Sequence, residues 1–226
     1  MLKTISKLLT ALVLSLTSFS HIEAQKIFMT GDSHVFSKIY PNTVESKLRG
    51  PNPDIEFSWW AKNGICFYSF NHNPEYFDSI FSFNPDILIV HLGTNGAFAD
   101  NFTKQAFGHE MEAFYETLMD HLPQLKVVFV TPFTNKKRRY RKRGKWRINY
   151  QNREAADVIK EFADAHENTF VVDNNASTGM KYIKSLNLIR RDNVHLTEAG
   201  YIDLGEEVGN EILNIGELWS SLDPGL

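Results

Sequence analysis

The sequence contains a single cysteine, Cys66, among its 226 residues. No internal disulfide can form, so the folded chain depends on its apolar core, and we expect Cys66 to be a small buried residue. The sequence also lacks a continuous apolar stretch of the roughly 20 residues that a membrane-spanning helix needs, and it has no internal repeats. These absences argue against a disulfide scaffold, a membrane span and a repeat array, and they leave a globular chain that is 42% hydrophobic and 23% charged.

The first 24 residues have the three parts of a secretory signal peptide. Lys3 and Lys7 provide positive charge, residues 8–16 (LLTALVLSL) form a short apolar core, and a polar stretch ends at the small residue Ala24. This order is typical of a cleaved export signal. We therefore expect residues 1–24 to be a signal peptide, residues 25–226 to form one domain, and the protein to be periplasmic or extracellular.

Basic charge is concentrated in one segment. Nine of the twelve residues 136–147 (KKRRYRKRGKWR) are Lys or Arg, although the net charge of the chain is −3. An exported and otherwise acidic chain does not fit a nucleic-acid partner. Arg138, Arg139 and Arg141 are candidate contacts for an anionic substrate, because guanidinium groups pair with carboxylates and phosphates. A solvated charged loop explains the same run equally well.

Short apolar runs alternate with segments of helical periodicity. Five runs have the length and composition of buried strands: Ile27–Thr30, Ile55–Trp60, Ile87–His91, Val127–Thr131 and Thr169–Val172. Apolar residues recur three to four positions apart around 107–118, 155–162 and 201–215. The alternation predicts a three-layer α/β/α domain with a central parallel sheet of about five strands. Loops at the carboxyl ends of such strands form the functional site.

The first of these loops, Gly31 to His34, supports two hypotheses. Asp32 and His34 could be metal ligands, or Ser33 could be a nucleophile. A two-metal site needs further carboxylates and histidines at ligand spacing, and the remaining histidines of the predicted domain have no such spacing. We therefore predict no metal site and take Ser33 as the nucleophile.

A serine nucleophile needs a base, a group that orients the base, and donors for the oxyanion. Asp192 and His195 stand three residues apart in "DNVH", so one turn can bring the carboxylate to the imidazole. The backbone N–H groups of Ser33 and Gly64 and the side-chain amide of Asn95 are candidate oxyanion donors, because each lies in a loop that follows a predicted strand.

Taken together, these segments resemble the SGNH hydrolases, the GDSL-like esterase and lipase family, whose four sequence blocks contribute Ser, Gly, Asn and His. The matching segments are "GDS" (31–33), "NG" (63–64), "GTN" (93–95) and "DNVHLTEAGY" (192–201). The resemblance implies a flavodoxin-like sheet, a Ser33–His195–Asp192 triad, an oxyanion hole that contains Gly64 and Asn95, and no cofactor.

The chain departs from the family pattern at two positions. His34 stands where the family often has an aliphatic residue, so we expect it to affect the acyl pocket as a substrate contact. Gly96 follows Asn95 where an acidic residue is common in the family, so we expect the Asn95 side chain to be supported differently here. Aromatic residues from Phe57 to Phe70 surround Gly64. We expect them to be core, with a sugar-stacking wall as the alternative.

The resemblance implies a serine esterase or lipase. The sequence has no long apolar stretch for a lid or a fatty-acyl tunnel, which favours small acyl esters, above all acetyl, on carbohydrate or cell-wall glycan. The expected partner is an acylated glycan, neutral or anionic, or another ester, with no nucleic acid. Three alternatives remain open: a lipase or lysophospholipase, a glycan O-acyltransferase with the same triad, and a non-catalytic glycan-binding module.

Overall fold

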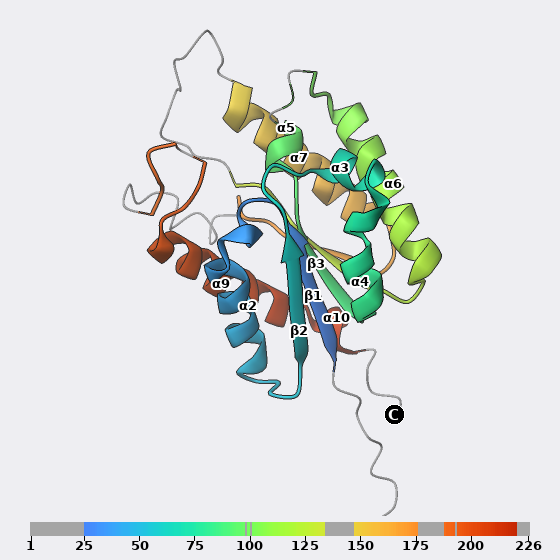
Figure 1. Cartoon of the computed structure of the whole chain (residues 1–226), viewed down its shortest axis with the longest axis vertical. Helices are drawn as coiled ribbons and strands as arrows, with labels where there is room; N and C mark the ends of the chain where they lie inside the picture. Colours follow the sequence, from blue (N-terminus) through green and yellow to red (C-terminus); the bar gives the residue numbers. More distant parts are fainter. Residues whose placement is uncertain are drawn as a thin grey trace, which may run out of the picture.

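A computed structural model describes residues 25–97, 99, 101–133, 147–175, 188–192 and 194–220 of the chain. Its centre is a sheet of five parallel strands in the order β2-β1-β3-β4-β5 (Figure 1). The strands are β1 (Lys26–Gly31), β2 (Glu56–Ala61), β3 (Ile87–His91), β4 (Lys126–Val130) and β5 (Thr169–Val172). Each of the five predicted strands is present, with ends shifted by one residue at most.

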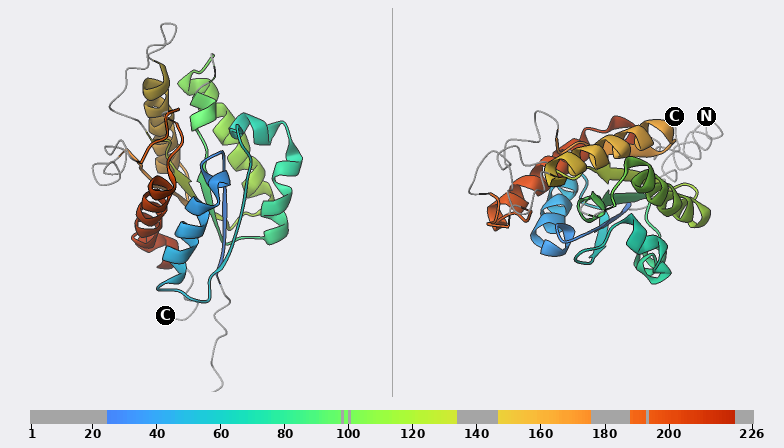
Figure 2. Two further views of the ribbon diagram at one scale, coloured as in Figure 1. Left: turned by 60° about the vertical axis from the view of Figure 1, so that its left-hand side comes forward. Right: turned by 90° about the horizontal axis from the view of Figure 1, so that it is seen from above.

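Helices cover both faces of the sheet, as the two turned views in Figure 2 show. They are η1 (Val35–Ser37), α2 (Ile39–Arg49), α3 (Phe67–Asn71), η2 (Pro74–Tyr76), α4 (Asp78–Phe83), α5 (Thr94–Ala97), α6 (Lys104–His121), α7 (Arg147–Ala165), α9 (Glu198–Leu213) and α10 (Gly216–Ser220). This arrangement confirms the predicted three-layer α/β/α class.

Alternate side chains of the strands pack into two separate hydrophobic cores, one on each face of the sheet. In β3, Ile87 and Ile89 pack with α2, α9 and α10, whereas Leu88 and Val90 pack with α3, α4, α6 and α7. All five residues of β3 are buried. A strand that is buried on both faces needs a continuous apolar run rather than an alternating one, and residues 87–90 (ILIV) form such a run.

The strand order reverses direction between β1 and β3, which pair in parallel through Gly31 and His91. In open parallel sheets, a crevice forms at this reversal, outside the carboxyl ends of the strands. The loops after β1, β2 and β3 therefore converge at one edge, where the predicted site residues lie.

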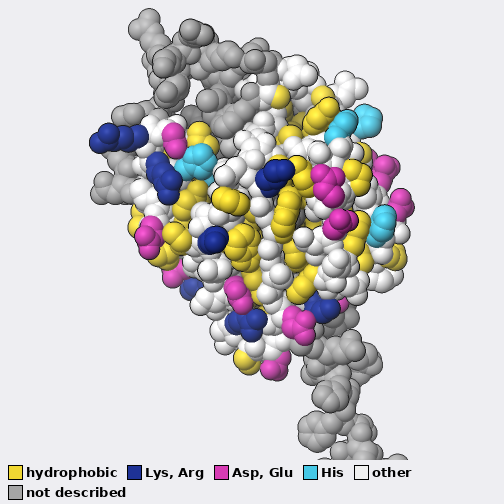
Figure 3. Space-filling model, in the orientation of Figure 1, with side chains coloured by type: hydrophobic (Ala, Val, Ile, Leu, Met, Phe, Trp, Pro, Cys, Tyr) yellow, Lys and Arg dark blue, Asp and Glu magenta, His cyan; other side chains and the backbone are white. Residues whose placement is uncertain are grey.

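The surface seen in Figure 3 carries acidic and basic side chains interspersed with hydrophobic ones. Two of the predicted segments, the signal peptide at 1–24 and the core of the basic run at 136–146, lie outside the described residues. Arg138, Arg139 and Arg141 are therefore not placed. Within the described part of the chain, no helix has both the length and the apolar character needed to cross a membrane.

Candidate active site

Ser33 lies directly after β1, in a loop that requires a glycine before it. A Cβ atom on Gly31 would come within 2.7 Å of the carbonyl oxygen of His91 and would also collide with the Val35 side chain. The N–H of Asp32 donates to that same carbonyl at 3.3 Å. This close approach of β1 to β3 ends the strand and leaves Ser33 half-buried at the sheet edge.

A short loop before α9 carries the other predicted catalytic residues. Ile189 and Leu196 form an antiparallel bridge, and the N–H of Arg190 donates to the carbonyl of His195 at 2.8 Å. Thr197 caps α9, because its hydroxyl oxygen accepts from the N–H of Gly200 at 3.3 Å. These bonds hold His195 in place although its side chain is 36% exposed.

The two loops bring Ser33, His195 and Asp192 together so that two consecutive hydrogen bonds link their side chains. His195 Nε2 lies 2.9 Å from Ser33 Oγ, and His195 Nδ1 lies 2.9 Å from Asp192 Oδ2. In the tautomer with its proton on Nδ1, the imidazole donates to the carboxylate and Nε2 can accept the hydroxyl proton of Ser33. This arrangement has the geometry that a serine nucleophile needs.

Asp192 is held as a charged group. Partial burial raises its pKa, but the N–H groups of Val194 and His195, which each donate to Oδ1 at 2.9 Å, and the His195 imidazole outweigh that effect. The pKa of Asp192 therefore lies below its ordinary value. An ionised carboxylate at this position keeps the Nδ1 proton of His195 in place.

The candidate oxyanion donors line the same cavity as Ser33. Gly64 is solvent-exposed with φ +80°, a left-handed conformation that favours glycine, and a Cβ there would meet nothing within 4 Å. Asn95 Nδ2 donates to Asp32 Oδ2 at 3.2 Å and to the carbonyl of Ile65 at 3.1 Å. Both amide hydrogens of Asn95 thus have acceptors, so an oxyanion would have to share one of them.

Asp32 is a buried carboxyl group that supports Asn95, a role different from the metal ligand that the Asp-x-His pattern offered. Burial raises its pKa to about 7, against the opposing effects of the His34 N–H, which donates to Oδ1 at 3.0 Å, and of the His195 charge. Its side chain is fully buried. The signal that could have identified this role is its position next to the nucleophile at the end of an apolar strand.

The position of His34 corrects the expectation that it contacts the substrate. Its side chain has no exposed surface, and its ring stacks on His91 with centroids 5.5 Å apart. His34 Nδ1 lies 3.4 Å from the Tyr201 hydroxyl, and His91 Nδ1 lies 3.1 Å from that of Tyr40. Neither Nε2 atom has a hydrogen-bond partner among the described residues. His34 packs behind His195, with ring centroids 5.7 Å apart.

Burial makes both of these imidazoles neutral. It lowers the pKa of His91 to about 3, and it lowers that of His34 well below the ordinary value, with further contributions from the charges of His91 and His195. The pair therefore behaves as uncharged core rather than as a second acid or base.

A cavity of about 560 Å³ is lined by the predicted catalytic residues. Five of its lining residues were predicted from the sequence: Ser33, Gly64, Asn95, Asp192 and His195. Phe36 and Arg190 also line it and were missed, because they lie outside the matching segments. Tyr201, the last residue of the segment 192–201, lines it too, although the sequence predicted no role for it. Within the described residues, no three His, Cys, Asp or Glu side chains are grouped so that they could hold a metal ion.

The aromatic residues near Gly64 divide between core and surface. Phe67 and Phe70 are buried as expected, but Tyr68 is 54% exposed. Cys66 is half-buried rather than buried, which corrects that expectation.

The model of the GDSL-like lipase/acylhydrolase family matches residues 37–201, which is more than half of the chain. No curated protein matches.

Several solved structures share the fold at low sequence identity. An acetyl xylan esterase, AlAXEase, is 20% identical with a TM-score of 0.65, over 83% of this chain and 99% of that one. A catalytic mutant of Axe2, an acetylxylan esterase from Geobacillus stearothermophilus, is 14% identical with a TM-score of 0.66, over 83% and 94%. A GDSL-like lipase from Parabacteroides merdae is 17% identical with a TM-score of 0.66, over 87% and 97%.

Proposed function

Since the chain belongs to the GDSL-like lipase/acylhydrolase family and is therefore an ester-hydrolysing serine hydrolase, we propose that it removes small acyl groups, above all acetyl, from carbohydrate. One observation carries the proposal: the continuous hydrogen-bonded line Asp192–His195–Ser33, with 2.9 Å at each link. These three residues line a solvent-accessible cavity that is large enough for a small ester.

In the proposed mechanism, Ser33 Oγ attacks the ester carbonyl while His195 Nε2 takes the hydroxyl proton. The carbonyl π electrons move to oxygen, and the resulting oxyanion accepts hydrogen bonds from the N–H groups of Ser33 and Gly64 and from Asn95. Collapse of this intermediate breaks the bond to the alkoxy oxygen, which leaves as an alcohol with the proton from His195. Water, deprotonated by His195, then attacks the carbonyl of the acyl-Ser33 ester. Collapse of this second intermediate breaks the bond to Ser33 Oγ, which takes the proton from His195 as the acid leaves.

The substrate class is supported by the shape of the site and by the similar structures. Two of these are acetylxylan esterases by name, although their low identity shows only the fold. The catalytic cavity is open, and His195 is 36% exposed, so a bulky polymer can reach Ser33. A long fatty-acyl chain would need an enclosed apolar channel.

The experiment that tests this function is hydrolysis of p-nitrophenyl esters from acetyl to palmitoyl by residues 25–226, beside Ser33→Ala. We expect the acetyl ester to have the highest kcat/KM, and we expect the variant to retain only background activity. Equal activity of Ser33→Ala would overturn the serine mechanism. A maximum at octanoyl or longer would point to a lipase instead.

An O-acyltransferase would use the same residues with a sugar hydroxyl in place of water. Adding acceptor glycans to the acetyl ester assay distinguishes the two activities, because a transferase gives acylated glycan as the main product. Hydrolysis predicts free acetate in equal amount to p-nitrophenol.

We also propose a cellular location for the protein. The charged start, short apolar core and small-residue end of residues 1–24 support export to the periplasm or the extracellular space. A fusion of residues 1–24 to a reporter enzyme that is active only after export should give activity, and Leu→Arg changes at Leu12 and Leu14 should abolish it.

A further inference from the structure

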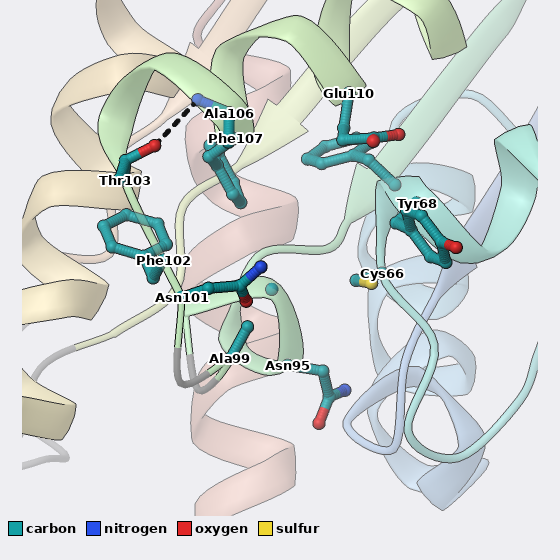
Figure 4. A pocket seen from close by; sticks show the side chains of 12 residues that line it. Cys66, Tyr68, Asn95, Ala99, Asn101, Phe102, Thr103, Ala106, Phe107 and Glu110 are labelled. Atoms are coloured by element: carbon teal, nitrogen blue, oxygen red, sulfur yellow. Dashed lines mark hydrogen bonds between the residues drawn. The ribbon is translucent and has the colours of Figure 1, made fainter.

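A second cavity, of about 390 Å³, lies beside the catalytic one. Its wall is built from the start of α3, from α5 and the segment that follows it, and from the first turns of α6 (Figure 4). Asn95 lines both cavities. A group bound in the second cavity would therefore be close to an ester carbonyl held by Asn95.

The inner wall of this cavity is apolar and closely packed. Phe67 and Phe107 are buried, and their rings meet edge to face with centroids 5.5 Å apart. A Cβ atom on Gly96 would come within 3.1 Å of the Phe107 ring. Glycine at this position therefore lets α5 lie against the Phe107 ring of α6.

The outer part of the cavity combines an exposed aromatic ring with hydrogen-bonding groups. Tyr68 is 54% exposed, and its ring stacks on His72 with centroids 3.8 Å apart, which fixes its orientation. Glu110 Oε2 accepts from Asn71 Nδ2 at 2.7 Å. The Asn101 side chain is exposed and has no hydrogen bond within the described part of the chain. Figure 4 shows Asn101, Cys66, Tyr68 and Glu110 all above Asn95, with Asn101 to the left and Tyr68 to the right.

This chemistry distinguishes between possible occupants. A fatty-acyl chain would cover the Asn101 amide and the second oxygen of Glu110 without offering either a hydrogen bond, and burying unpaired polar groups is costly. An anionic sugar would be repelled by Glu110. A neutral sugar ring suits the site, because its C–H faces can lie on an aromatic ring while its hydroxyls bond to the carboxylate and the amide.

We propose that this cavity is a subsite for a neutral sugar ring of the acylated glycan, next to the ring whose ester Ser33 attacks. Tyr68 provides the stacking surface, and Glu110 and Asn101 bind hydroxyl groups. This inference rests on the proposed carbohydrate esterase function, and it makes the preferred substrate an uncharged oligosaccharide rather than an acetylated monosaccharide.

The first test is binding of an unacetylated neutral oligosaccharide, xylotetraose, to Ser33→Ala by calorimetry, which does not depend on catalysis. Adding Tyr68→Ala should weaken binding about 5- to 10-fold, as expected for one lost aromatic contact. Ile202→Ala is the matched control, because Ile202 is 41% exposed on α9 and lines neither cavity. Unchanged binding in the Tyr68 variant, or an equal loss in the Ile202 control, would overturn the subsite.

The second test compares substrates. Tyr68→Ala should lower kcat/KM for acetylated xylotetraose about 5- to 10-fold relative to kcat/KM for p-nitrophenyl acetate. A change in preference between acetyl and octanoyl esters instead would make the cavity an acyl-chain site and overturn the proposal. If the wild type cleaves no ester at all, the proposed function fails, while xylotetraose binding still decides the subsite.

Cys66 provides an independent readout, because it is the single cysteine of the chain and lines the cavity. Xylotetraose should slow the reaction of Cys66 with a maleimide at least threefold, and an equal concentration of xylose should protect less. Absence of protection at concentrations that saturate binding would place the oligosaccharide elsewhere and contradict the proposal.

Discussion

At the residue scale, Asp192 is the group on which His195 depends for its orientation. Its two oxygens accept three hydrogen bonds, of 2.9 Å each, from the Val194 N–H, the His195 N–H and the imidazole. The loop itself is exposed, so Asp192 acts through these bonds rather than through burial. The catalytic geometry is therefore more sensitive to the chemistry of this side chain than the fold is.

Asp192→Asn should lower kcat by roughly 10⁴-fold with little change in stability. An amide can still accept from the two N–H groups, but its own N–H would face His195 Nδ1 and favour the tautomer protonated on Nε2. Asp203→Asn on α9 is the matched control and should retain full activity, since Asp203 lines neither cavity. A loss below tenfold in Asp192→Asn would show that another group orients His195.

At the element scale, α2 and α9 pack closely through two glycines. A Cβ on Gly205 would come within 2.6 Å of Thr43 Cβ and 3.0 Å of the Tyr40 carbonyl, and a Cβ on Gly209 would come within 2.6 Å of Lys47 Cβ. These close approaches bring Tyr201, one turn before Gly205, against His34. Helix packing thus supports the wall behind the catalytic loop.

Gly205→Ala should destabilise the fold by about 1–3 kcal/mol, because the added methyl group forces α2 and α9 apart. Gly108→Ala on α6 is the opposite case, since its Cβ would meet only Val158 at an ordinary 3.5 Å. It should stabilise the fold by about 0.5–1 kcal/mol through helix propensity. Urea unfolding measures both, and equal effects in the two variants would contradict the packing account.

The strands and long helices could be predicted because their periodicity is strong over many residues. The three predicted helical segments correspond to α6, α7 and α9, although Ile215 lies beyond the end of α9. Helix α2 was missed, even though Tyr40, Val44 and Leu48 have a spacing of four and are buried. Pro41 in its first turn obscured the pattern, since proline is tolerated there but usually marks a break.

The site residues likewise divide into those that the sequence could predict and those that only the structure shows. The predicted residues from four separate segments line one cavity, because parallel strands end at one edge of the sheet. The burial of His34 and the exposure of Tyr68 depend on which side chains meet in three dimensions. Local sequence contains no information about such contacts, so these features required the structure.

At the scale of the whole molecule, the buried polar groups behind the site make stability depend on pH. His34 and His91 have lowered pKa values, so their stabilising neutral form is fully present above about pH 6.5 and stability is lost as the pH falls below it. Asp32 has a raised pKa of about 7, so its effect is opposite: stability is lost as the pH rises from 3.8 to about 7. Two histidines outweigh one carboxyl group on the acid side.

His34→Leu should therefore reduce the pH dependence of unfolding free energy. Between pH 5.5 and 4.5, the wild type must take up one more proton on unfolding than the variant does, which corresponds to about 1.4 kcal/mol per pH unit. Urea unfolding at each pH gives the two slopes. Parallel slopes would mean that His34 is protonated in the folded state, contrary to its burial.

Labelling by diisopropyl fluorophosphate, followed by mass spectrometry, shows whether Ser33 is a nucleophile activated by His195. We expect one phosphoryl adduct per chain, located on Ser33, absent in Ser33→Ala and formed at least 100-fold more slowly in His195→Ala. An adduct on another residue, or an enzyme that cleaves esters while Ser33 stays unlabelled, would contradict this role of Ser33.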